Sequence, residues 1–143
     1  MTQVVYLTPA EARLLETYEK RYRKAARLRI EERTAFFHKI TGGNYTSITI
    51  RDQKTRWGSC SSSGTLSFNY RLIFAPPAIL DYVVVHELCH LTHMNHSRDF
   101  WNMVESVLPD YKERRQWLKE HGQELNLLTF LEKKGIDYRL TST

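Results

Sequence analysis

The 143-residue sequence predicts an α+β fold with a long N-terminal helix, a small antiparallel sheet, a histidine-rich helix and further C-terminal helices. Three observations support this class. Apolar residues recur at helical spacing over residues 9–40, and they alternate in two short segments between residues 46 and 70. Helix-capping signals recur after residue 97. No repeat or linker divides the chain, so we expect one domain over residues 1–143.

The first helix has clear signals at both ends. Thr8 can cap its N-terminus, Pro9 suits the first helical position, and Glu11 completes a capping box. The pattern stops at Gly42, which is followed by a second glycine. We therefore expect a helix over residues 9–40.

The middle of the chain predicts strands. Residues 46–51 and 65–70 alternate between apolar and polar side chains, and turn-forming residues dominate positions 52–64 between them. A hairpin or meander is the simplest arrangement of these two strands. Pro77 then suits the first position of a helix.

The C-terminal third predicts helices. Ser97 can cap a helix that runs to about residue 108, and residues 110–113 have the pattern of a second capping box. That second helix should end at Gly122, and a short last helix is expected over residues 125–134.

Composition narrows the class of protein. The chain has 41% hydrophobic residues, two cysteines and a net charge of +5. Two cysteines are too few for a disulfide scaffold, and no apolar run is long enough for a signal peptide or a membrane span. We expect a soluble, cytoplasmic protein without a membrane partner. The excess of basic residues makes a nucleotide or nucleic acid a candidate partner, whereas the sequence does not specify an oligomeric state.

A histidine cluster carries the strongest chemical signal. His86, Glu87 and His90 form an HExxH motif within the expected helix. The two histidines are separated by about 40° around a helix and can bind one zinc ion, while Glu87, rotated by about 100°, can reach a water on that ion. A catalytic zinc site needs three protein ligands and one open position.

His93 and His96 compete for the third ligand position. His93 would lie a further turn along a continuing helix, too far to close a tetrahedron with the first two histidines. His96 could return to the metal through a chain reversal around Met94 and Asn95, because asparagine tolerates the left-handed conformation. We therefore predict His96 as the third ligand.

A family resemblance is carried by several short motifs in order. They are RWGSC at 56–60, LSFN at 66–69, APP at 75–77, the segment 82–90 with HExxH, NHS at 95–97 and FW at 100–101. This order resembles the YgjP-like metallopeptidase family over about residues 45–122. The metzincin consensus is a weaker match, since its glycine position is occupied by His93. The resemblance implies a minimal zincin fold, a peptide or protein substrate, zinc on the HExxH helix and a third ligand at His96.

The leading hypothesis is a zinc-dependent metallopeptidase in which Glu87 is the general base. We expect Arg56, Asn69 and Tyr70 to contact the substrate, and an exposed edge of the strand at 65–70 to hold an extended peptide.

Two alternatives remain from the residues themselves. A metal-dependent nucleotide phosphohydrolase could use Arg51, Lys54 and Arg56 to hold phosphates. A basic nucleic-acid-binding module with a non-catalytic metal site is the other alternative.

Overall fold

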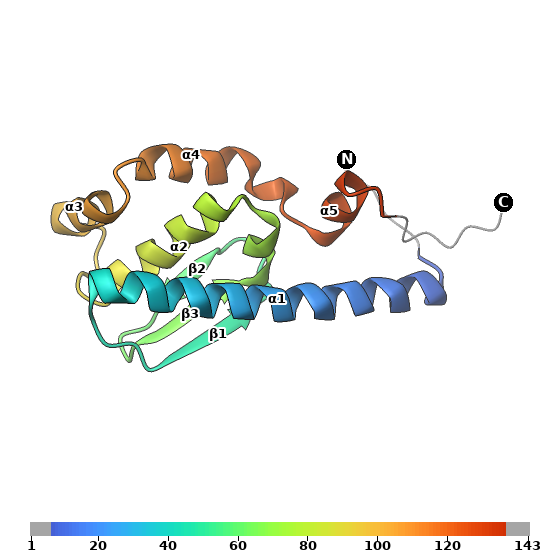
Figure 1. Cartoon of the computed structure of the whole chain (residues 1–143), viewed down its shortest axis with the longest axis horizontal. Coiled ribbons are helices and arrows are strands. Elements are labelled where there is room, and N and C mark those ends of the chain that lie inside the picture. Colours follow the sequence, from blue (N-terminus) through green and yellow to red (C-terminus); the bar gives the residue numbers. More distant parts are fainter. Residues whose placement is uncertain (1–6, 137–143) are drawn as a thin grey trace.

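The computed structural model describes residues 7–136, and α2 lies at the centre of the fold (Figure 1). The elements are, in chain order, α1 (Pro9–Thr41), β1 (Ser47–Arg51), β2 (Gly58–Cys60), β3 (Thr65–Asn69), the 3₁₀ helix η1 (Tyr70–Phe74), α2 (Pro77–His90), α3 (Arg98–Val107), α4 (Tyr111–His121), the 3₁₀ helix η2 (Gly122–Glu124) and α5 (Leu127–Lys133). α2 contacts α1, α3, α4 and the sheet. The predicted α+β class and the long N-terminal helix are confirmed.

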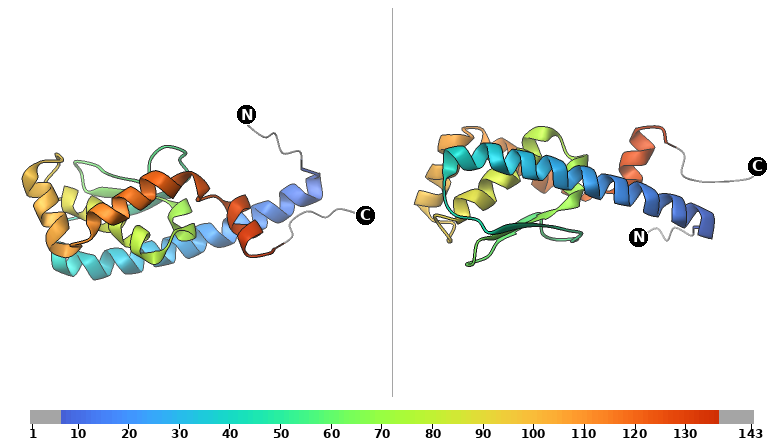
Figure 2. Two further views of the ribbon diagram at one scale, coloured as in Figure 1. Left: turned by 90° about the horizontal axis from the view of Figure 1, so that it is seen from above. Right: turned by 60° about the horizontal axis from the view of Figure 1, so that its bottom comes forward.

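Helix α1 begins and ends close to the predicted positions. The Thr8 hydroxyl accepts a hydrogen bond from the backbone N–H of Glu11 at 3.1 Å, and the Glu11 carboxylate accepts one from the Thr8 N–H at 2.9 Å. This is the predicted capping box. Arg33 fixes α1 to α2 through two hydrogen bonds to Asp81, of 2.8 and 3.0 Å. The N-terminal turns of α1 project beyond the sheet (Figure 2).

The sheet is mixed rather than antiparallel, which corrects the sequence-based expectation. Its order is β1-β3-β2, with β1 parallel to β3 and β2 antiparallel to β3. The turn-rich segment between the two predicted strands contains β2, a third strand of only three residues. Because β1 and β3 run parallel, they do not form a hairpin, and β2 occupies the second edge of β3. β3 is the central strand and has no free edge.

The C-terminal helices follow the predicted order with two differences. Ser97 caps α3 as expected by accepting a hydrogen bond from the backbone N–H of Phe100. The predicted capping box at Asp110 is wrong, because its carboxylate forms an ion pair with Arg114 at 3.0 Å and does not bind the helix N-terminus. α5 is shorter than expected and is capped by Asn126.

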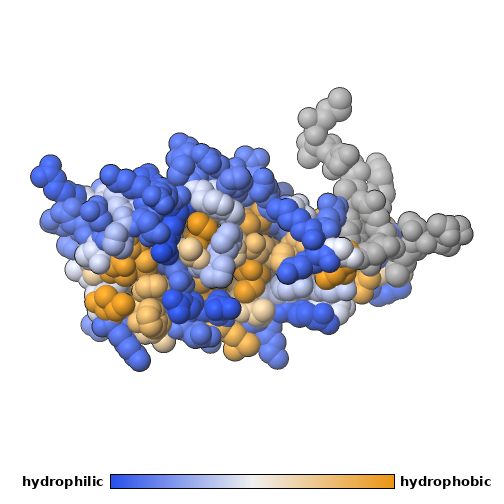
Figure 3. Space-filling view, turned by 45° about the horizontal axis from the view of Figure 1, so that its top comes forward, coloured by the Kyte–Doolittle hydropathy of each residue, from blue (hydrophilic) through white to orange (hydrophobic). Residues whose placement is uncertain are grey.

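The core surrounds α2, which is buried on most of its circumference. A helix that is apolar on nearly all sides must be covered by other elements, and here the sheet, α1, α3 and α4 cover it. Hydrophilic residues occupy much of the face in Figure 3, with apolar areas between them. Within residues 7–136, no helix is long and apolar enough to cross a membrane. The polar histidine motif thus lies on a helix that other elements enclose on most sides.

Candidate metal centre

Three histidine rings converge at the C-terminal end of α2. The Nε2 atoms of His86 and His90 are 3.2 Å apart, and the Nε2 atom of His96 lies 3.2 Å from the first and 3.1 Å from the second. Nitrogens that share one tetrahedral zinc ion at 2.0–2.1 Å lie about 3.3 Å from one another. The separation of the three nitrogens therefore fits a single metal ion.

The opposite ring nitrogens have contacts of their own. The Nδ1 atom of His90 donates a hydrogen bond to the backbone oxygen of His93 at 2.9 Å, which fixes its tautomer with the Nε2 lone pair free. The Nδ1 atom of His86 faces the Tyr82 hydroxyl at 3.4 Å. His93, which was not predicted as a metal ligand, therefore contributes its backbone oxygen to the site.

The environment of His86 and His90 favours their neutral forms. Burial, together with the neighbouring His90 and His96, lowers the pKa of His86 to about 3. Burial also lowers the pKa of His90, and the hydrogen bond to His93 opposes this shift. Neutral imidazoles offer lone pairs, which is the protonation state that a metal requires. The Nε2 atom of His96 lies next to these two lone pairs, so the donor set fits a cation.

Helix α3 forms an aromatic wall behind the histidines. Phe100 is fully buried and stacks on His90 with ring centroids 4.3 Å apart. Trp101 stacks on His96 at 5.8 Å. The chain between α2 and α3 reverses without a left-handed asparagine, since no described residue other than glycine has a positive φ. The expected left-handed Asn95 is therefore wrong, although the reversal itself brings His96 back to the other two histidines.

Glu87 lies beside this centre and is only 5% exposed. Burial raises its pKa to about 8, and the positive charge of Arg56 opposes the rise. A metal cation at the histidines would favour the carboxylate further. Gly58 on β2 leaves room for this side chain, because a Cβ atom there would lie 2.9 Å from Glu87 Oε2 and 3.1 Å from Val83. The close approach of β2 thus fixes the position of Glu87.

A cleft of about 390 Å³ opens over Glu87 and His86. Its lining residues come from the segment before β2, from α2 and from α4; they are Thr55, Arg56, Trp57, Gly58, Tyr82, Val83, His86, Glu87, Arg115, Leu118 and Lys119. Sequence reasoning missed Arg115 and Lys119. Their spacing of four places both on one side of α4, but nothing in the sequence relates α4 to the histidine motif.

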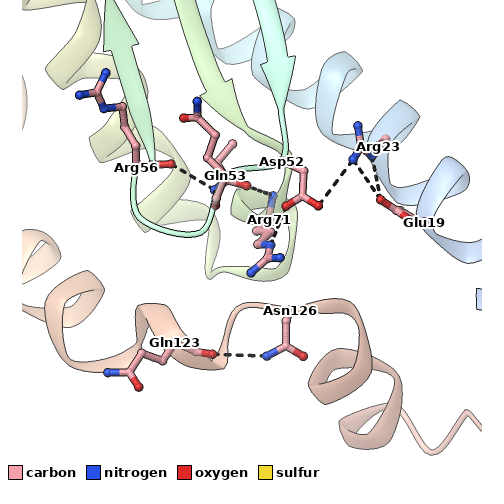
Figure 4. A network of polar contacts seen from close by, with 9 residues as sticks. Glu19, Arg23, Asp52, Gln53, Arg56, Arg71, Gln123 and Asn126 are labelled. Atoms are coloured by element: carbon pink, nitrogen blue, oxygen red, sulfur yellow. Dashed lines mark hydrogen bonds and ion pairs between the residues drawn. The ribbon is translucent and has the colours of Figure 1, made fainter. Parts of the chain in front are cut away.

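Of the three predicted substrate residues, the structure brings only Arg56 to the cleft. Asn69 is buried, and its side-chain amide donates hydrogen bonds to the backbone oxygens of Gln53 and Arg56. Figure 4 shows the Arg56 backbone in this network while its guanidinium points away from it. Tyr70 is buried below Arg23, whose guanidinium lies 4.9 Å from the ring. In this structure, Asn69 orders the loop that carries Arg56, and Tyr70 packs in the core.

The two cysteines do not offer a reactive thiolate. Cys89 is fully buried within α2, and burial raises its pKa to about 12. Cys60 is half-buried on β2, and burial and the nearby Glu87 raise its pKa. A thiolate nucleophile requires the opposite shift, so neither cysteine is a candidate nucleophile.

Comparison with known proteins agrees with this geometry. A family model described as "YgjP-like, metallopeptidase domain" matches residues 3–121. The chain belongs to the YgjP-like metallopeptidase family. The match starts well before residue 45, so it also covers α1.

A solved structure supports the same assignment for this YgjP-like chain. It is the metallopeptidase zymogen of Pyrococcus abyssi abylysin, with 28% sequence identity and a TM-score of 0.56. The similarity covers 63% of this chain and 93% of abylysin. Among curated proteins, no match is found.

Proposed function

We propose that the protein is a zinc-dependent peptidase with zinc on His86, His90 and His96 and Glu87 as general base. The observation that carries this proposal is the convergence of three Nε2 atoms next to a buried carboxylate at an open cleft. When bound, zinc supplies a Lewis acid that polarises a peptide carbonyl and makes a water molecule more acidic. The donor set of three neutral imidazoles, with one position left open, suits that catalytic ion.

Glu87 performs the proton transfers in this proposal. Its carboxylate accepts a proton from the attacking water and then donates that proton to the departing amine nitrogen. Its buried position beside Gly58 supports this role, because a fixed carboxylate holds the water without reorganising.

The substrate backbone is proposed to pair with β2. The strand order leaves β2 at an edge of the sheet, and Gly58 lines the cleft. An extended peptide can add to such an edge through backbone hydrogen bonds. The sequence-based expectation placed the extended peptide on β3, but both edges of β3 are already paired. We therefore place the peptide on β2.

Zinc content and hydrolysis measured on the same samples test the proposal. The wild type should hold about one zinc per chain and cleave peptides from a broad library. Glu87→Gln should retain zinc and lose cleavage, because the amide cannot accept the proton. Cleavage that persists in Glu87→Gln, or a wild type that cleaves no peptide with zinc bound, would contradict it.

A nucleotide phosphohydrolase is a second candidate function. The observation that favours it is the set of three cations at the cleft: Arg56, Arg115 and Lys119. Arg51 and Lys54, which the sequence also suggested, do not line this cleft. Metal-dependent phosphate release from nucleoside triphosphates, lost in Glu87→Gln, would support this function over the peptidase.

The nucleic-acid-binding alternative has less support. Four basic residues of α1 have acidic partners, which reduces the net field of the helix; they are Lys20, Arg23, Arg27 and Arg33. This alternative stays a prediction that salt-dependent binding to DNA or RNA would test.

A further inference from the structure

Three of the described basic residues that have no acidic partner lie together at the cleft. Within residues 7–136, no ion pair joins Arg56, Arg115 or Lys119 to an acidic side chain, although five other arginines have such partners; they are Arg23, Arg27, Arg33, Arg71 and Arg114. Glu87 is the one acidic residue among those that line the cleft, and it is buried at the base. The cleft therefore presents three positive charges against a single carboxyl group at its base.

Two of these cations are placed close to the metal centre by the fold. Arg115 and Lys119 are four residues apart on α4, so they lie on the same side of that helix. The Arg115 guanidinium lies 4.8 Å from the ring of Trp101, which in turn stacks on His96. A guanidinium that stacks through its face keeps N–H donors at its edge for a ligand.

The rest of the lining suits a peptide side chain. Trp57, Val83 and Leu118 bring apolar surface to the cleft beside the cations. Methylene groups of an acidic side chain can lie on such surface while the carboxylate contacts the cations. Gly58 of the edge strand β2 also lines the cleft, and this edge can pair with the peptide backbone.

We propose that Arg115 and Lys119 form a subsite for a peptide carboxylate close to the scissile bond, with Arg56 on the facing wall. This inference rests on the proposed peptidase function and names its substrate class: peptides with Asp, Glu or a free C-terminal carboxylate within about two residues of the cleaved bond. The shared chemistry is the carboxylate, which can belong to a side chain or to the chain terminus.

Binding to zinc-loaded Glu87→Gln tests the subsite without turnover. Four peptides of one sequence are compared, with Glu or Gln beside the scissile bond and with a free or amidated C-terminus. Calorimetry gives the affinities, and tryptophan fluorescence offers a second readout because Trp57 lines the cleft and Trp101 lies under Arg115. Each carboxylate contact should strengthen binding about ten-fold, as expected for a charge-assisted hydrogen bond.

Substitutions assign the effect to α4. Lys119→Gln and Arg115→Gln should each remove most of the advantage of the carboxylate peptides, and Arg115→Lys should restore part of it. Lys24→Gln changes the same charge on an exposed position of α1 that does not line the cleft, and it should leave the preference unchanged. Zinc content and thermal melting check folding, and Lys119→Gln, on an exposed position, tests the subsite if Arg115→Gln does not fold.

The outcomes separate this inference from the proposed function. Equal affinity for all four peptides, or an unchanged preference in Lys119→Gln, would overturn the carboxylate subsite. If the wild type nevertheless cleaves the neutral peptide, the peptidase function stands without it. If the wild type cleaves no peptide but binds a nucleoside triphosphate through Arg115 and Lys119, both proposals fail and the phosphohydrolase is favoured.

Discussion

The three-histidine centre (His86, His90 and His96) and the cationic rim of the cleft (Arg56, Arg115 and Lys119) are built differently. The histidines come from one short stretch of chain and are held by a backbone oxygen, a tyrosine hydroxyl and two stacked aromatic rings. Arg56, Arg115 and Lys119 come from two distant segments, and Arg115 and Lys119 are exposed. A catalytic centre needs fixed geometry, whereas a recognition surface tolerates mobile side chains. Substitutions on the two sides should therefore have effects of different size and kind.

The largest effect on stability is expected from the aromatic wall. Phe100 is fully buried and contacts the rings of all three histidines. Phe100→Ala should lower the free energy of unfolding by about 3–5 kcal/mol through the cavity it leaves. Phe36→Ala is a matched control, because Phe36 is 50% exposed and its loss should cost far less. Urea unfolding measures both, and equal losses would contradict a rigid wall.

Metal-free protein should show opposite pH effects from Glu87 and His86. The pKa of Glu87 is raised from 4.5 to about 8, so its contribution to stability is full below pH 4.5 and is lost as pH rises towards 8. The pKa of His86 is lowered from 6.5 to about 3, so its contribution is full above pH 6.5 and is lost as pH falls towards 3. Each loss is of the order of a few kcal/mol.

Chelator-treated protein should therefore be most stable at intermediate pH, between the acidic loss caused by His86 and the alkaline loss caused by Glu87. Urea unfolding at several pH values measures this stability. Glu87→Gln should remove the alkaline loss and leave the acidic one. An alkaline loss of the same size in Glu87→Gln would show that another group causes it.

A smaller effect, on activity, is expected from a substitution of Gly58, where β2 meets Glu87. Gly58→Ala places a Cβ atom 2.9 Å from Glu87 Oε2, so the carboxylate must shift. Cleavage should fall about ten- to a hundred-fold, as expected for a misplaced catalytic group, while zinc content stays at the wild-type level. Gly42→Ala is the control for a glycine substitution, since a Cβ atom there meets nothing within 4 Å, although its φ of +68° adds local strain. Equal activity in Gly58→Ala and wild type would contradict the positioning role.

The contrast between the histidines, which come from one stretch of chain, and the cations, which come from distant segments, also explains which features could be predicted from the sequence. The Thr8 cap and the spacing of His86 and His90 are local patterns, and local patterns determine helix ends and faces. The return of His96 to the other two histidines was predicted from its spacing, although the left-handed Asn95 expected at the reversal is wrong. The parallel pairing of β1 with β3 did not, because it depends on β2, whose three residues lie in a turn-rich segment.

Long-range packing also explains the positions of residues that a single sequence does not place. Asn69 and Tyr70 were predicted to contact the substrate. In the structure, the Asn69 side chain binds the backbone of the loop that carries Arg56, and Tyr70 is buried in the core. Arg115 and Lys119 were missed because α4 reaches the cleft only through its packing on α2. Residues that reach a cleft only through such packing have no signature in a single sequence.

Zinc stoichiometry in two histidine variants tests the central claim most directly. His93→Ala keeps the backbone oxygen that accepts from His90 and removes a side chain outside the three-histidine cluster. His96→Ala removes one of the three converging nitrogens. We predict about one zinc per chain in His93→Ala and strongly weakened zinc binding in His96→Ala, measured by metal analysis after dialysis. Full zinc occupancy in His96→Ala, or its loss in His93→Ala, would contradict the proposed metal centre.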